Sequence, residues 1–379
     1  MIRRLLTLAA LAACLPLPSL AQNAPANPGD LVVAQIGPFT VLPAPDPKEL
    51  NEGIRAGLAE INAAGGIQGR RVRLITLDDA YSFDGFKSQL GNALESQAVA
   101  LLAPLGSATL KAMLDSKLLD TTDTVIINAV PGAKVLREPG HPKFFHIRAG
   151  DEQQIRKIVA HARALNIRSM GVLHQDIPIG TSGLASAQAA GREGDGGFDI
   201  QGFQATTDAT AIAAAAQALA TAAPQSALVV GAPKFVGESI AALRKAGVGQ
   251  QIFTLSYVPA PALVKFAGAG ARGVGMAQTF PNPAGVSLAV QRSFRSAMKK
   301  ALPTVTTFTA FHMEGYITVR VFAEAARRAR SLTPAGIAQA LRNMGELDLG
   351  GFRVNFSKGN VGSQWVDIGV ATADGQLLY

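Results

Sequence analysis

The feature that most constrains the fold of this chain is a regular alternation of short apolar runs with segments of helical periodicity. In the first part of the sequence, four runs of strand length are each separated by enough residues for a helix. They span Leu31 to Ile36, Val72 to Leu77, Val99 to Ala103 and Val125 to Ile127. Repeated strand–helix units with short connections predict parallel sheets that are covered by helices on both faces.

Helix start and stop signals lie in the intervals between these runs. Asp46-Pro47 has the form of an N-cap followed by a proline at the first helical position. Gly65-Gly66 is typical of a helix end. The apolar residues between them recur on one helical face, at Leu50, Ile54, Leu58 and Ile61. Two more helices are expected, one from Asp84 and one from Ser107, with Ser107 as the cap of the second.

The alternation resumes after Gly150 and then changes in character. Strands are expected over Met170 to Leu173, Phe198 to Phe203, Ala227 to Val230 and Ile252 to Leu255. The alanine-rich segment 211–223 between the second and third of these is interpreted as a buried helix. After Pro281-Asn282-Pro283 the sequence predicts two long helices, about 286–301 and 309–329, followed by a helix at Thr333-Pro334 and a strand-like C-terminal segment.

Composition excludes several other classes of protein. Hydrophobic residues make up 48% of the 379 positions and charged residues 16%, which excludes a disordered chain. Cys14 is the one cysteine, so neither a disulfide framework nor a cysteine-based zinc site is expected. The formal net charge is +8, but the lysines and arginines are scattered and no aromatic residues interleave with them. A nucleic-acid partner is therefore not predicted.

The N-terminus has the pattern of a secretory signal peptide. Arg3 and Arg4 precede an apolar run from Leu5 to Leu17, and Ser19-Leu20-Ala21 forms a cleavage pattern before Gln22. Residues 1–21 are therefore expected to be removed after Ala21. The alternative is that Leu11-Ala12-Ala13-Cys14 acts as a lipobox, which would leave a protein anchored through Cys14.

No catalytic constellation is found in the sequence. Gly268, Gly270 and Gly273 have dinucleotide-type spacing, but a helix is expected before them and a strand after them, the reverse of the order that motif requires. Asp78-Asp79 is interpreted as a structural turn at a strand end. No histidine has metal-ligand spacing, and a secreted α/β hydrolase would need a nucleophile–base pair that is not present. We therefore expect a protein that is not an enzyme and has no cofactor or metal.

One segment is suited to ligand binding. Leu105-Gly106-Ser107-Ala108-Thr109 lies between an expected strand end and an expected helix start. Open parallel sheets bind ligands outside the carboxyl ends of their strands. A helix N-terminus there offers free backbone N–H groups to an anion such as a carboxylate, and Ser107 and Thr109 add hydroxyl donors.

Several motifs along the chain carry a family resemblance. They are Ile36-Gly37-Pro38-Phe39, the run Glu60-Ile61-Asn62-Ala63-Ala64-Gly65-Gly66, Asp78-Asp79-Ala80-Tyr81, Phe145-His146-Ile147-Arg148, Leu243 to Gly247, Glu314-Gly315-Tyr316 and Leu349 to Phe352. In these motifs the sequence resembles the leucine/isoleucine/valine-binding protein family, the type I periplasmic solute-binding proteins of ABC importers.

The resemblance implies an α/β fold of two lobes, each a mostly parallel sheet flanked by helices, joined by three crossovers and closing over a ligand. It places the crossovers near Arg148, Gln278 and Gln364. Residues 22–148 and 279–364 would then form lobe 1, and residues 149–278 and 365–379 would form lobe 2.

The resemblance also implies ligand-binding residues. Ser107 matches a serine that holds the ligand carboxylate, and the loop Ala129-Val130-Pro131-Gly132 stands where the family has Pro-Ala-Ala-Thr. Ser256 occupies the place of the family's ammonium-binding glutamate. The complete expected set is Tyr81, Gly106, Ser107, Ala108, Thr109, Val130, Pro131, Gly132, Ile179, Lys234, Ser256, Tyr257 and Phe311.

Two of these departures bear on the ligand. Gly132 removes the threonine oxygen, and Ser256 beside Tyr257 is uncharged, so an ammonium group would lack its partner. An organic acid with an apolar or aromatic body is therefore favoured over an amino acid. The alternative is a carboxylate that reaches the cleft from elsewhere, for which Asp176 and Glu238 are the candidates nearest in sequence.

The sequence thus predicts a periplasmic receptor, expected to be a monomer, that delivers a small organic carboxylate or amino acid to the membrane permease of an ABC importer. The alternative is a sensory receptor of the same fold that reports its ligand to a membrane kinase or regulator.

Overall fold

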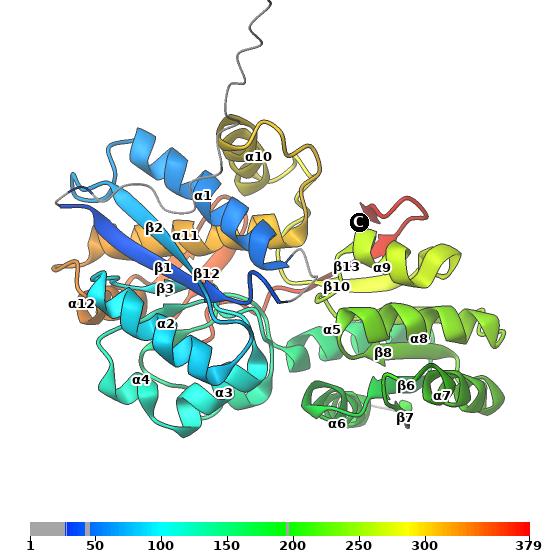
Figure 1. Cartoon of the computed structure of the whole chain (residues 1–379). Coiled ribbons are helices and arrows are strands. Elements are labelled where there is room, and N and C mark those ends of the chain that lie inside the picture. Colours follow the sequence, from blue (N-terminus) through cyan, green and yellow to red (C-terminus); the bar gives the residue numbers. More distant parts are fainter. Residues whose placement is uncertain (1–26, 28, 42–45, 195–196) are drawn as a thin grey trace, which may run out of the picture.

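The computed structural model describes residues 27, 29–41, 46–194 and 197–379, so the predicted leader and Cys14 lie outside the described residues. The elements form two lobes that lie side by side (Figure 1). The alternation predicts the sheets flanked by helices, and the family resemblance implies their arrangement in two lobes. In the described part of the chain, no helix has both the length and the apolar character needed to cross a membrane.

The sheet of lobe 1 has five parallel strands in the order β2-β1-β3-β4-β5. Since β2 lies on one side of β1 and β3 on the other, the strand order reverses between β1 and β3, where doubly wound sheets bind ligands. The strands are β1 (Leu31–Gly37), β2 (Val72–Asp78), β3 (Leu101–Leu102), β4 (Ile126–Ile127) and β5 (Phe144–Phe145).

The helices of lobe 1 come from two distant parts of the chain. The first group is α1 (Asp46–Ala63), α2 (Phe83–Glu95), α3 (Ser107–Asp115) and α4 (Leu118–Thr121), with the 3₁₀ turn η1 (Lys134–Leu136). The second group is α10 (Ala289–Ala301), α11 (Ala310–Arg328) and α12 (Pro334–Asn343), with the hairpin of β11 (Glu346–Asp348) and β12 (Arg353–Asn355).

Helices α1 and α11 pack with their backbones in close approach. A Cβ atom on Gly53 would lie 2.0 Å from the carbonyl oxygen of His312, and one on Gly315 would lie 2.2 Å from that of Leu50. Only glycine fits at these positions. The N-termini of the two helices are thereby held beside each other at the edge of lobe 1.

The sheet of lobe 2 has seven strands in the order β14-β13-β10-β9-β8-β6-β7. Strands β6 to β10 are parallel and repeat the order seen in lobe 1, whereas β13 and β14 add antiparallel to one side. The strands are β6 (Ser169–Gln175), β7 (Asp199–Ala205), β8 (Ser226–Val230), β9 (Gln251–Thr254), β10 (Gly275–Gln278), β13 (Asp367–Ala371) and β14 (Leu377–Leu378).

The helices of lobe 2 precede or follow these strands. They are α5 (Asp151–Ala164), α6 (Pro178–Arg192), α7 (Ala209–Ala222), α8 (Pro233–Lys245) and α9 (Ala260–Ala267), with the 3₁₀ turn η2 (Gly268–Ala271). The order α9, η2, β10 confirms that the spaced glycines follow a helix and precede a strand.

Two sequence predictions about helices are wrong. Helix α3 is capped by Gly106 and not by Ser107, which is its first helical residue. Gly106 has φ +93°, a conformation that glycine adopts readily, and this places the helix start one residue earlier. Helix α7 buries only Ile212, Ala215, Ala216 and Leu219, so it covers the sheet with one face and is not a buried helix.

Candidate functional site

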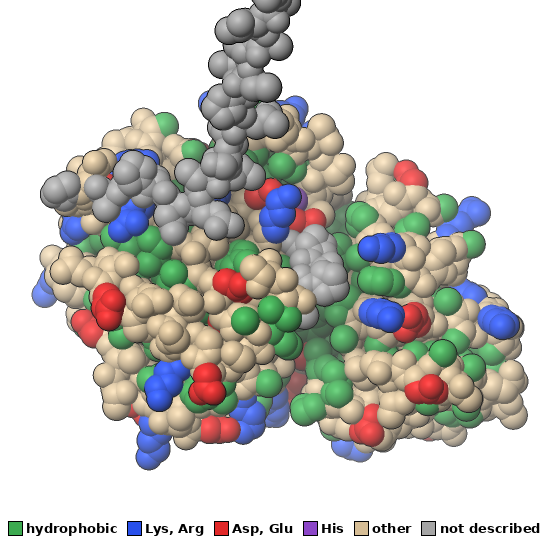
Figure 2. Space-filling view, in the orientation of Figure 1, with side chains coloured by type: hydrophobic (Ala, Val, Ile, Leu, Met, Phe, Trp, Pro, Cys, Tyr) green, Lys and Arg blue, Asp and Glu red, His purple; other side chains and the backbone are tan. Residues whose placement is uncertain are grey.

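The carboxyl ends of the two parallel sheets meet at the junction between the lobes. The loop after β4 in lobe 1 contacts the loop after β9 in lobe 2, since the backbone N–H of Gly132 donates to the Tyr257 hydroxyl at 2.6 Å. Figure 2 shows a hollow between the lobes on this face, lined largely by hydrophobic side chains. Most of the predicted site residues lie on loops or in the first turns of helices that follow strands of the two sheets, and Phe311 lies in the first turn of α11.

The start of α3 forms the lobe 1 side. Ser107 and Ala108 are exposed, while Gly106 and Thr109 are buried. The first intrahelical bond runs from the N–H of Leu110 to Gly106, which leaves the preceding N–H groups of Ser107, Ala108 and Thr109 free for an anion. In the described structure the Ser107 hydroxyl makes no hydrogen bond, so it is available to a ligand as well.

Tyr81 and the loop after β4 lie against this helix start. Tyr81 is 48% exposed. Its ring would lie 3.5 Å from a Cβ atom placed on Gly106. The N–H of Val130 donates to the carbonyl of Pro104 at 3.2 Å. Topology therefore brings together the ends of β2, β3 and β4 beside the reversal in strand order.

Asp78-Asp79 forms the structural turn that leads to Tyr81. Asp78 accepts hydrogen bonds from the N–H groups of Phe39 and Ala80, and Asp79 accepts one from Tyr81. Backbone hydrogen bonds and the Thr40 hydroxyl hold the pKa of Asp78 below its usual value, against the effect of burial. No group of three or more metal-ligating side chains is found in the described ranges.

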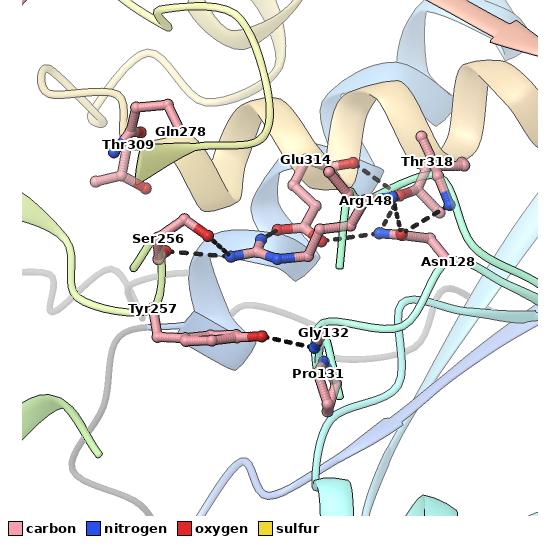
Figure 3. A network of polar contacts seen from close by, with 12 residues as sticks. Asn128, Pro131, Gly132, Arg148, Ser256, Tyr257, Gln278, Thr309, Glu314 and Thr318 are labelled. Atoms are coloured by element: carbon pink, nitrogen blue, oxygen red, sulfur yellow. Dashed lines mark hydrogen bonds and ion pairs between the residues drawn. The ribbon is translucent and has the colours of Figure 1, made fainter. Parts of the chain in front are cut away.

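A buried ion pair lies behind the junction (Figure 3). Arg148, on the segment that leaves β5 for α5, pairs with Glu314 of α11, and their side chains are 2% and 1% exposed. The side-chain amide of Asn128 donates to Oε1, the other carboxylate oxygen of Glu314, at 2.9 Å. The ion pair thus ties the first crossover to the core of lobe 1.

Arg148 also reaches lobe 2. Its Nη2 donates to the hydroxyl of Ser256 at 2.5 Å and to the Ser256 carbonyl at 3.2 Å. The Ser256 hydroxyl in turn donates to Gln154 at 2.8 Å. Ser256 is therefore engaged by protein groups, and its contribution to the site is to hold Arg148 rather than to present a free oxygen.

Two aromatic side chains of the predicted set flank the same guanidinium. Its Cζ lies 5.1 Å from the ring centre of Tyr257 and 5.9 Å from that of Phe311. Phe311 is 1% exposed and belongs to the core of lobe 1. Arg148 thereby connects the adjacent residues Ser256 and Tyr257 with Phe311, which lies far from them in the sequence.

The junction contains carboxyl groups that the sequence analysis did not place there. Asp151, at the start of α5, accepts a hydrogen bond from the Tyr257 hydroxyl, and its Oδ2 is buried without a partner in the described structure. Burial raises the pKa of both Asp151 and Glu314, while the neighbouring Arg137 and Arg148 oppose this shift. A carboxyl group thus lies beside Tyr257, although Ser256 itself carries none.

Asp46 supplies another carboxyl at the start of α1. Burial and then the neighbouring Glu49 raise its pKa to about 7, whereas Arg148 lowers it. Its Oδ1 is buried and, in the ranges described, has no hydrogen-bond partner. Of the two candidate carboxylates from the sequence analysis, Asp176 is exposed and Glu238 pairs with Lys234 at 3.6 Å.

Ile179 and Lys234 are the predicted residues on helices of lobe 2. Both lie in the first turns of helices, α6 and α8, that follow adjacent strands of lobe 2. Ile179 is half-buried against the lobe 2 core, and the Lys234 side chain is 72% exposed. They lie at the carboxyl edge of the lobe 2 sheet, opposite the lobe 1 loops.

The comparisons with known proteins agree with this architecture. Residues 31–376 match the family described as periplasmic binding protein. An extracellular ligand-binding receptor from Verminephrobacter eiseniae is 48% identical, with 92% of this chain and 100% of that chain covered and a TM-score of 0.88. A search of curated proteins gave no match.

More distant solved structures share the fold. A substrate-binding periplasmic protein from Ralstonia solanacearum is 24% identical over 92% of this chain and 99% of that one, with a TM-score of 0.81. A leucine binding protein from Thermotoga maritima is 17% identical over 92% and 97%, with a TM-score of 0.77. The expected two-lobed type I fold is confirmed, and this chain belongs to the periplasmic binding protein family, whose members are ligand-binding receptors and not enzymes.

Proposed function

We propose that this protein is the substrate receptor of an ABC importer and that it binds a small organic carboxylate between its lobes. The observation that carries the proposal is the start of α3. There, three backbone N–H groups and the Ser107 hydroxyl have no partner in the described residues and lie after the carboxyl end of β3, at the reversal in strand order. A carboxylate placed there would accept hydrogen bonds from groups that the fold leaves free.

The body of the ligand would lie against the aromatic and apolar groups around this anion site. Tyr81 lies beside the helix start, while Tyr257 and Ile179 approach from lobe 2. A ligand that touches both lobes favours the closed arrangement by its differential affinity for that state. The proposed ligand is therefore an aromatic or branched aliphatic acid, and an amino acid is the alternative to be tested.

The proposed place of action follows from the expected leader. Cleavage after Ala21 would release the protein into the periplasm, where it would deliver its ligand, as a monomer, to a membrane permease. Isolation of the exported protein and sequencing of its N-terminus would test this: Gln22 supports cleavage there, and a lipid-modified Cys14 would show an anchored protein.

A thermal-shift screen tests ligand binding. The chain from Gln22 to Tyr379 would be heated with aromatic acids, aliphatic acids, dicarboxylates, amino acids and amides, with a neutral sugar as control. A ligand that binds only the folded state stabilises it by about 2.7 kcal/mol at a hundredfold excess over Kd. We expect a raised midpoint with at least one carboxylate; stabilisation by amides or sugars alone would contradict the proposal.

A further inference from the structure

The Tyr257 side chain makes a direct polar connection between the two lobes. Its hydroxyl accepts a hydrogen bond from the N–H of Gly132, in the lobe 1 loop after β4, and donates one to Asp151, at the start of α5 in lobe 2. Burial raises the pKa of this hydroxyl well above its usual value, so it keeps the proton that it donates. Both hydrogen bonds use the same oxygen atom.

The fit around this oxygen depends on the glycine at position 132. A Cβ atom there would lie 2.1 Å from Oδ1 of Asp151 and 2.5 Å from the Tyr257 hydroxyl oxygen. The carbonyl of Gly132 also accepts the N–H of Asp151 at 3.0 Å. The glycine that removes a threonine from the predicted ligand site is thus the residue that permits this contact.

A second polar connection lies directly beside the first. Arg148, paired with Glu314 of lobe 1, donates to Ser256, the residue before Tyr257. Gln154 of α5 accepts from the Ser256 N–H at 3.0 Å and from its hydroxyl at 2.8 Å. The loop that carries Tyr257 is therefore fixed on both sides, so protein groups alone set the position of its hydroxyl.

We propose that Tyr257 is a positioning residue that fastens the two lobes together in the ligand-free protein. If the lobes separated, the Gly132 N–H would lose its partner on Tyr257 and would have to be satisfied by water. The connection favours the closed arrangement independently of ligand and lowers the cost of closure when ligand binds. The inference goes beyond the proposed function and does not depend on the identity of the ligand.

The test measures the distance between the lobes without ligand. Because the chain from Gln22 to Tyr379 has no cysteine, the exposed Ser88→Cys on α2 and Lys245→Cys on α8 provide two spin-label sites, one in each lobe. Pulsed electron–electron double resonance would compare the distance between the two labels in this protein and in its Tyr257→Phe variant. We expect a single short distance in the parent. In the variant, the ratio of open to closed molecules should rise at least tenfold.

Tyr316→Phe is the matched control. The Tyr316 hydroxyl also donates to a carboxylate, Glu60, at 2.7 Å and accepts from an N–H donor, Arg320, at 2.8 Å, but both partners lie in lobe 1. Its removal should leave the distance between the labels unchanged. An equal shift in both variants would show a general loss of stability and would overturn the proposal.

Gly132→Ala provides a second variant, because the added methyl group would press Asp151 and Tyr257 apart while leaving every polar group in place. It should also lengthen the distance between the lobes. If the parent is already open without ligand, or if Tyr257→Phe and Gly132→Ala both keep its short distance, Tyr257 does not fasten the lobes.

Discussion

Replacement of Arg148 by methionine should be among the most destabilising single changes in this protein. The guanidinium pairs with Glu314, and the two side chains are 2% and 1% exposed. Without it, Glu314 loses its ion pair and keeps the hydrogen bond from Asn128 and the more distant charge of Arg137. Breaking such a pair from one side costs about 3–5 kcal/mol. Two hydrogen bonds to Ser256 are lost as well.

The cost should depend on pH and on the partner. Burial raises the pKa of Glu314, and loss of Arg148 removes the opposing effect. A carboxyl whose folded-state pKa lies above its unfolded value loses stability as the pH rises through that interval. Arg148→Met should therefore cost more at pH 8 than at pH 5. The double variant Arg148→Met with Glu314→Leu should recover most of the loss, since apolar replacement of a buried pair is often nearly neutral.

Urea unfolding, followed by circular dichroism, would measure these changes in the free energy of unfolding. The control is Arg156→Met, which removes the exposed partner of Glu193 and should cost less than about 1 kcal/mol. A loss below about 1 kcal/mol for Arg148→Met, or a double variant as unstable as the sum of its single changes, would refute the argument.

Three further predictions concern the ligand and the cleft. In calorimetric titrations, phenylpropionate should bind at least tenfold tighter than phenylalanine, and 4-methylpentanoate tighter than leucine. Tighter binding of both amino acids would show that Asp151 or Asp46 binds the ammonium group. Asp46→Asn should gain thermal stability relative to the unmodified protein as the pH rises from 5 to 8, because the pKa of about 7 makes the charged carboxyl unfavourable in the folded state; a difference independent of pH would contradict this. By small-angle scattering, saturating ligand should reduce the radius of gyration more in Tyr257→Phe than in the unmodified protein. Equal profiles of the Tyr257→Phe variant with and without ligand would indicate a fixed pocket.

Much of the fold could be predicted because it depends on local patterns. The apolar runs and helical faces anticipate both sheets, and α1 begins at Asp46, one residue earlier than the predicted N-cap position of Asp46 implies. The start of α3 was predicted only to within one residue, because an N-cap serine and a glycine with positive φ are both compatible with Gly106-Ser107.

The polar junction could not be predicted in the same way. Arg148 and Glu314 are 166 positions apart, and Asp151 and Tyr257 are 106 positions apart, so spacing gives no signal for either contact. Arg148 and Glu314 both lie in motifs that carry the family resemblance, and this was the signal in the sequence that pointed to them. The carboxyl group beside Tyr257 comes from Asp151, whose position suggests only a helix start.

The most direct test of the central claim is a calorimetric titration of the Ser107→Ala variant with the tightest carboxylate from the screen. Since the Ser107 hydroxyl has no hydrogen bond within the described structure and the residue is exposed, its removal should change stability by less than about 0.5 kcal/mol. Loss of a hydrogen bond to a charged ligand should weaken binding by about 1.5–3 kcal/mol, tenfold or more. Ser88→Ala, an exposed serine on α2, serves as the control. A tenfold loss of affinity at unchanged stability is the predicted result, and affinity equal to that of the unmodified protein would show that the carboxylate does not bind at the start of α3.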